Sequence, residues 1–172
     1  ILKKVLGLYA AKGWKPIIAP DVDFYLVSQN VDPDFPLVPP TGSSGRAETA
    51  SQPYGLEAMN EYEDIIDHIY DDCELMGIDI DTMIHEMGAA QLEVNFLHGD
   101  PLKLADQVFL FKRVVRAVAK QHGVYATFMA NPMAGQPGSA MHIHQSVVDA
   151  ETGKNLFSNA NGKDSAMFRS YI

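Results

Sequence analysis

The alternation of polar and apolar side chains over residues 91–96 is the feature that most constrains how this chain can fold. In an extended strand successive side chains point to opposite faces. One face of this segment then carries Leu92, Val94 and Phe96, and the other carries Gln91, Glu93 and Asn95. The pattern predicts a strand that packs one face on a core and turns the other toward a polar environment.

Further segments show the periodicities of strands and helices. We expect strands over residues 15–28, 82–87, 125–129 and 141–148, and helices over 1–13 and 55–76. The strongest helix pattern begins with Asp100 as N-cap and Pro101 at the first helical position, and ends near His122 and Gly123. Together these elements predict an α+β fold, with a largely antiparallel sheet and packed helices.

Composition narrows the class of protein. A chain of 172 residues can bury a core of its own, and no apolar run approaches the roughly 20 residues of a membrane span. The net charge of -9 argues against a nucleic-acid partner. Cys73 is the single cysteine, which excludes an intrachain disulfide and fits a cytoplasmic location.

The segment from Gln29 to Pro53 is rich in proline and glycine and has no periodic apolar face. A loop of this length is usually functional or mobile. We expect it to be mobile or partly disordered when substrate and neighbouring subunits are absent, because little burial offsets the cost of ordering it.

Acidic and histidine side chains lie on the polar faces of three predicted strands. Asp21 and Asp23 share one face, about 7 Å apart. Such a pair repels unless a cation lies beside it. The second group is His85 and Glu86 followed by Gln91 and Glu93. The third group shares one face of the last strand and consists of His142, His144 and Ser146. Four carboxylates and a histidine suit Mg²⁺ or Mn²⁺ better than Zn²⁺, because hard oxygen donors dominate.

Three segments resemble the motifs of glutamine synthetases, in the same order. Residues 131–146, with the sequence NPMAGQPGSAMHIHQS, resemble the signature loop and strand of that family. Residues 85–96 resemble its second metal-binding segment, and residues 100–129 resemble the helix and strand that join the two. The chain is therefore similar to part of a glutamine synthetase catalytic domain, from about residue 15 to residue 157.

The resemblance implies two adjacent Mg²⁺ or Mn²⁺ ions that bracket a transferred phosphate. Asp23, Glu86 and Glu93 would hold one ion near glutamate and the amine. Asp21 and His142 would hold the other among the phosphates of ATP. The implied reaction joins the side-chain carboxylate of glutamate to ammonia or an amine, through γ-glutamyl phosphate, in a homo-oligomeric ligase.

The resemblance also implies substrate-binding residues. Pro137 and Gly138, together with His142, would lie beside the glutamate, where a glycine lets a substrate approach the backbone. His144 and Ser146 would lie on the nucleotide side.

Four departures from the family pattern suggest a divergent branch. The family's first metal motif is Glu-x-Glu, but this chain has Asp21 and Asp23, each shorter by one methylene group, or roughly 1.3 Å. Asn131 and Pro137 replace the usual lysine and asparagine, and the interval from Glu86 to Glu93 is one residue short. These differences favour a bulkier amine, such as a polyamine.

The family also has a small N-terminal domain and further catalytic residues after the histidine strand, and we expect both to lie outside this chain. We therefore expect the fragment alone to be inactive. One alternative is a pseudoenzyme with an assembly or binding role, because fold does not determine function. Another is a zinc hydrolase of the His-x-His type.

Overall fold

The computed structural model describes residues 1–172 and divides them into two compact units. Unit 1 contains residues 1–20, 98–106 and 143–172, and unit 2 contains residues 21–97 and 107–142. The elements in chain order are α1 (Leu2–Ala10), β1 (Trp14–Ser28), α2 (Leu56–Asn60), α3 (Glu63–Leu75), β2 (Ile80–His85), β3 (Gln91–Phe96), α4 (Pro101–Gln121), β4 (Val124–Thr127), β5 (Met141–Asp149) and α5 (Ala166–Arg169).

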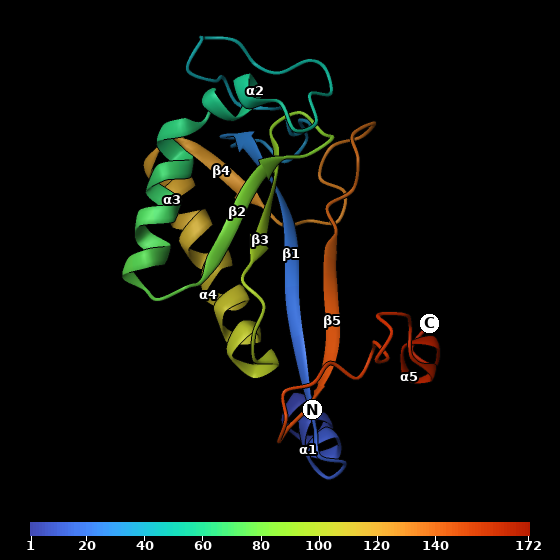
Figure 1. Cartoon of the computed structure of the whole chain (residues 1–172). Coiled ribbons are helices and arrows are strands. Elements are labelled where there is room, and N and C mark those ends of the chain that lie inside the picture. Colours follow the sequence, from blue (N-terminus) through green and yellow to red (C-terminus); the bar gives the residue numbers. More distant parts are fainter. The chain divides into compact units, whose positions relative to one another are not determined.

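The strands form one five-stranded sheet, in the order β2-β3-β1-β4, and β5 pairs with β1 outside this order (Figure 1). The pairs β1–β3, β1–β4 and β2–β3 are antiparallel. The fold class expected from the sequence, an α+β fold with a largely antiparallel sheet, is confirmed. None of the helices combines the length and the apolar character that crossing a bilayer requires.

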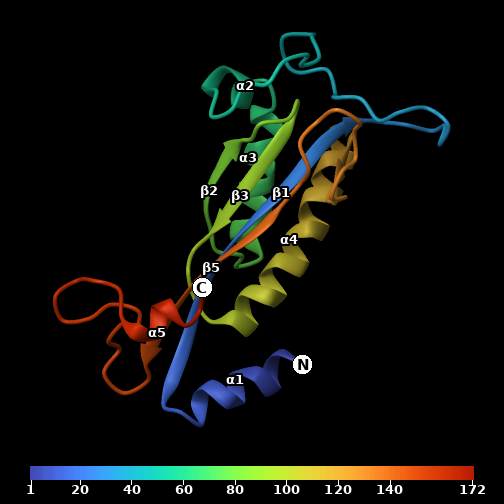
Figure 2. The same ribbon diagram turned by 90° about the vertical axis from the view of Figure 1, so that its right-hand side faces the viewer.

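The core of unit 2 lies between the sheet and α4. In Figure 1 α4 passes behind the sheet, and in Figure 2 it stands to one side of β1 and β3. The ring of Phe111 on α4 contacts three other rings edge to face, those of Phe24, Phe96 and Phe128, at centroid distances of 6.1, 5.3 and 6.3 Å. Such pairs add to the stabilisation that burial alone supplies.

The predicted start of the long helix is confirmed within unit 1. The carboxylate of Asp100 accepts hydrogen bonds from the backbone N–H groups of Leu102 and Lys103, both at 3.0 Å. These bonds satisfy two of the donors that a helix leaves unpaired at its N-terminus.

Several expected boundaries were wrong. The helix predicted over 1–13 is α1, which ends at Ala10, and the strand predicted over 125–129 is β4, which ends at Thr127. The helix predicted over 55–76 is divided into α2 and α3, because the backbone of Tyr62 leaves helical geometry at φ -123° and ψ 18° while its side chain is buried. The strand predicted over 82–87 runs from Ile80 to His85, so Glu86 lies just beyond its end. Side-chain periodicity alone does not reveal where a backbone leaves a regular conformation.

The long segment 29–53 has no helix or strand beyond one bridge between Thr41 and Ala47. Its mobility stays a prediction, but two of its side chains are held by unit 2. Leu37 packs against the buried Tyr25, Val27 and Met133, and Glu48 is buried. The loop therefore has more anchorage than its composition suggests.

Replacement of Phe111 by alanine should destabilise unit 2 strongly. The change removes a fully buried ring and leaves a cavity, which typically costs about 3–5 kcal/mol. Chemical denaturation monitored by circular dichroism would measure the loss. The matched control is Phe109→Ala, because that ring on the same helix is 64% exposed and should change stability by less than about 1 kcal/mol. Equal losses from the two variants would contradict the described packing.

Candidate metal centre

The polar face of β1 and β3 lies opposite the aromatic core. The register pairs Asp23 with Glu93 directly across the two strands, and Tyr25 with Gln91. Like charges placed opposite each other on neighbouring strands destabilise a sheet. The fold therefore places two carboxylates in a position that favours a bound cation or proton.

Three of the predicted ligands converge on this face. Asp21, Glu93 and His142 each offer one ligand atom, and these three atoms lie within 4.8 Å of one another. Asp21 is buried, Glu93 is partly buried and His142 is exposed. Oxygen and nitrogen ligands at about 2.0–2.6 Å from a shared ion can be separated by roughly 3–5 Å. The spacing of the three atoms therefore fits one divalent ion.

Asp23 adds an unsatisfied oxygen to the same face. Its Oδ2 accepts hydrogen bonds from the backbone N–H of Ala140 at 2.8 Å and from the Gln91 side chain at 3.4 Å. Its Oδ1 is buried and has no hydrogen-bond partner. A buried carboxylate oxygen without a donor is costly, and a divalent cation would satisfy it.

The environment of Glu93 favours its protonated form. Burial raises the pKa of Glu93 to about 7, and the neighbouring carboxylates of Asp23, Glu86 and Asp21 add to the shift. A cation would act in the opposite direction, because it stabilises the carboxylates together. The donor set therefore fits Mg²⁺ or Mn²⁺, with oxygen atoms in the majority.

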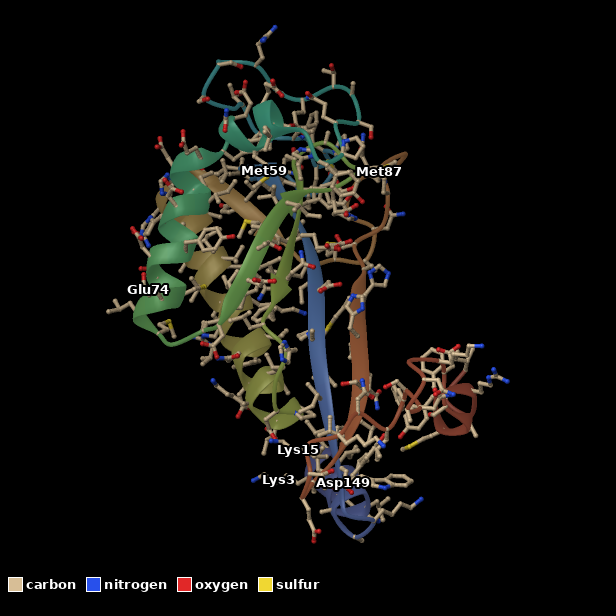
Figure 3. The ribbon with its side chains drawn as sticks, viewed as in Figure 1. Lys3, Lys15, Met59, Glu74, Met87 and Asp149 are labelled. Carbon is tan, nitrogen blue, oxygen red and sulfur yellow. The ribbon has the colours of Figure 1, made fainter.

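Glu86 lies at the edge of this group, in the turn between β2 and β3. Its Oε2 accepts a hydrogen bond from the backbone N–H of Met87 at 3.1 Å, and Figure 3 labels Met87 at this turn. Its charge contributes to the raised pKa of Glu93. The resemblance assigns Glu93 to one ion with Asp23 and Glu86. In the structure the ligand atom of Glu93 also lies within 4.8 Å of those of Asp21 and His142, which the resemblance assigns to the other ion.

The loop that precedes β5 is fastened to the same strands. The hydroxyl of Tyr25 donates to the carbonyl of Pro137 at 2.7 Å, and the Gln91 side chain donates to the carbonyl of Gly138 at 3.2 Å. Burial raises the pKa of Tyr25 to about 12, with the charges of Asp23 and Glu86 contributing, so its hydroxyl remains a donor at neutral pH.

Comparison with known proteins identifies the family of this chain. The profile described as "Glutamine synthetase, catalytic domain" matches residues 1–172, the whole chain.

The chain belongs to the glutamine synthetase catalytic-domain family.

Named relatives agree with this assignment. The chain is 33% identical to Gamma-glutamylputrescine synthetase PuuA of Escherichia coli (strain K12), over all of this chain and 37% of that protein. It is 36% identical to the glutamine synthetase of Halobacterium salinarum, over 92% of this chain and 33% of that protein. The chain thus spans about a third of the length of these relatives.

Solved structures of similar fold include one described as a GmaS/ADP complex. Its TM-score is 0.75 at 29% identity, over 92% of this chain and 35% of that one. Another, described as a novel glutamine synthase homolog, has a TM-score of 0.77 at 21% identity, over 95% of this chain and 35% of that one, and supports the fold alone.

The remaining glutamine synthetase motif residues lie in the loop before β5 and on β5 itself. The carbonyls of Pro137 and Gly138 face Tyr25 and Gln91, and a Cβ on Gly138 would lie 2.9 Å from the carbonyl of Ala130, so close packing also explains this glycine. The other two motif residues lie on β5 within unit 1: His144 and Ser146. Their contacts with substrate and nucleotide stay predictions.

Sequence reasoning missed several residues that support the site. Tyr25 gave no signal beyond its place in a predicted strand, whereas Gln91 was placed on the polar face beside Glu93 but was assigned no role. Gly88 is required because a Cβ there would lie 1.9 Å from the Tyr25 hydroxyl oxygen. Glu48 gave no signal, because it lies in an aperiodic loop.

Replacement of Glu93 by glutamine should stabilise the metal-free chain at alkaline pH. A folded pKa of about 7, above the ordinary 4.5, means that Glu93 favours folding at low pH and opposes it as pH rises from about 5 through 7. Melting temperatures at pH 5 and pH 8.5 in a chelator should therefore differ less in Glu93→Gln than in the wild type.

The matched control is Glu74→Gln, which changes an exposed carboxylate on α3. This variant should keep the wild-type dependence on pH. If Glu93→Gln and Glu74→Gln respond to pH in the same way, the crowding of carboxylates around Glu93 is wrong.

Proposed function

We propose that this chain supplies the metal centre of an ATP-dependent ligase that joins the side-chain carboxylate of glutamate to an amine. One observation carries the proposal: in a chain of the glutamine synthetase family, Asp21, Glu93 and His142 bring their ligand atoms within 4.8 Å of one another. The unsatisfied Oδ1 of Asp23 beside them adds a further donor for a divalent ion.

The five predicted ligands would hold two ions in this proposal. Asp21 and His142 would hold the ion on the nucleotide side, Asp23 and Glu86 would hold the ion on the glutamate side, and Glu93 would contribute to both. Bound Mg²⁺ or Mn²⁺ would neutralise the charge that builds up between ATP phosphate and glutamate. In the reaction the glutamate carboxylate attacks the terminal phosphate, ADP leaves, and the amine then displaces phosphate from γ-glutamyl phosphate.

Other residues of the chain would orient the substrates. Tyr25 and Gln91 hold the carbonyls of Pro137 and Gly138, so the loop that we assign to glutamate is fixed to the two strands that carry Asp23 and Glu93. His144 and Ser146 would contact the nucleotide. Positioning of this kind lowers the entropic part of a barrier, because the reacting groups are held together before reaction.

The amine is proposed to be larger than ammonia. The E. coli relative at 33% identity is named a gamma-glutamylputrescine synthetase, and Pro137 stands where the nitrogen-assimilating enzymes often have asparagine. A diamine or polyamine is therefore the substrate class to test first. The complete site, including a homo-oligomeric arrangement, is proposed for a protein of which this chain is part.

The pseudoenzyme remains the second candidate. It is favoured by Asp21 and Asp23, which are shorter than the glutamates of the family, and by the use of Asp23 Oδ2 as a hydrogen-bond acceptor for Ala140 and Gln91. The zinc hydrolase is less well supported, because the group that includes His142 contains two carboxylates and no second histidine.

Metal binding tests the centre directly. Mn²⁺ titration of the chain, followed by electron paramagnetic resonance, should detect binding that weakens at least tenfold in His142→Ala and in Glu93→Ala, because each removes a ligand. His98→Ala is the matched control, since His98 is an exposed histidine outside the acidic group, and it should bind Mn²⁺ like the wild type. Unchanged binding in all three variants would exclude this centre.

A double substitution separates the ligase from the pseudoenzyme. Asp21→Glu with Asp23→Glu restores the family's side-chain length. In an adapted active site this change should leave Mn²⁺ affinity equal or weaker and should not raise turnover of glutamate, amine and ATP by the parent protein. A marked gain in Mn²⁺ affinity would instead indicate a decayed site. Release of ADP and phosphate that needs both glutamate and an amine would establish the reaction.

A further inference from the structure

Glu48 is a buried acid that no part of the proposed chemistry uses. It lies in the long loop that follows β1, yet only 9% of its surface is exposed. Both of its carboxylate oxygens lie 3.0 Å from Nε2 of His85. Its Oε2 also accepts a hydrogen bond from the backbone N–H of Ala90. A buried carboxylate is retained at low cost only when it is paired in this way.

His85 links Glu48 to the turn that carries Glu86. The ring is fully buried at the end of β2, and its Nδ1 lies 2.7 Å from the backbone carbonyl of Glu86. A carbonyl only accepts, so Nδ1 carries the proton in this bond. The imidazole therefore bridges the carboxylate of Glu48 and the backbone of Glu86.

The backbone of Ala90, in the same turn, has a strained conformation. Its φ of 57° lies in the left-handed region, which disfavours residues other than glycine, and its side chain is fully buried. The N–H of this residue is the one that Glu48 accepts, while its carbonyl accepts from the N–H of Leu26 on β1 at 3.0 Å. Glu48 thus contacts both ends of the turn, at His85 and at Ala90.

We infer that Glu48 is a positioning residue of the metal centre, which acts through His85 and Ala90 to hold Glu86 and Glu93 at the spacing that a shared divalent ion requires. The inference rests on the proposed function, because it assigns Glu86 and Glu93 as ligands. Ligands must be held to within a fraction of an ångström for tight binding, and supporting contacts outside the ligand set supply this order. The hydrogen bonds of Glu48 join it to the ring of His85 and to the backbone of Ala90, so its effect on the ligands would pass through the turn.

A purely structural role would have different consequences. Glu48 also ties the loop to unit 2, as does the N–H of Tyr54, which donates to the carbonyl of His85 at 2.9 Å. If anchoring of the loop were the whole role, any lost anchor would have the same effect on metal binding. Glu61 allows the comparison, because its carboxylate holds the same loop by accepting a hydrogen bond from the N–H of Ser44 at 2.8 Å, and this bond does not involve the Glu86 turn.

The test compares Glu48→Gln with Glu61→Gln in the chain. Glutamine keeps the shape of Glu48 but removes the charge and one acceptor. The Mn²⁺ dissociation constant, measured by electron paramagnetic resonance, should rise at least tenfold in Glu48→Gln and by less than twofold in Glu61→Gln. Equal effects of the two variants, or no effect of Glu48→Gln, would overturn the inference.

A double substitution tests whether Glu48 acts through Glu86. Glu48→Gln combined with Glu86→Gln should weaken Mn²⁺ binding by less than the sum of the two single losses, because part of the effect of Glu48 passes through Glu86 and part through Glu93. Independent, additive losses would overturn the inference. Circular dichroism would check that each variant is folded, and Glu48→Asp, which keeps the charge but is too short to reach both His85 and Ala90, should lie between wild type and Glu48→Gln.

The outcomes distinguish this inference from the proposed function. A wild-type chain that binds no Mn²⁺ would contradict the metal centre itself and the inference with it. A wild-type chain that binds Mn²⁺, and loses it in His142→Ala but not in Glu48→Gln, would leave the metal centre intact and overturn only the role of Glu48.

Discussion

The carboxylates of Asp23 and Glu93 face each other across β1 and β3, and the organisation of the polar face depends on this pair. Like charges in this position cost stability unless a proton or a cation is shared between them. The raised pKa of Glu93 and the unsatisfied oxygen of Asp23 are two consequences of the same conflict. The repulsion between these carboxylates lowers the stability of the sheet, and a bound cation would remove it.

The strand alternation couples this conflict to the core. Phe24 lies between Asp23 and Tyr25 in the sequence, and it packs on Phe111 while its neighbours face the polar side. A shift of the register by one residue would reverse both faces together. The aromatic core therefore maintains the position of the acids, and the stability of unit 2 offsets the repulsion between them.

Much of this arrangement could be predicted from the sequence, because it follows from a period of two. The strand from Gln91 to Phe96 has the predicted bounds, and Asp100 caps the predicted helix. The period of the side chains along one segment does not show which distant segments pair. The opposition of Asp23 and Glu93, and the contact of Glu48 with His85, could therefore not be predicted from it. Residues in aperiodic loops acquire their roles only through tertiary contacts.

The turn between β2 and β3, which lies between Glu86 and Glu93, connects these observations. It uses Ala90 in a left-handed conformation and Gly88 where no Cβ fits. Strain of this kind persists only when neighbouring contacts over-determine the backbone. Glu48 supplies such contacts from a loop far away in the sequence. The turn and the buried acid are therefore best understood as parts of one arrangement, in which a strained backbone is stabilised by a residue of a distant loop.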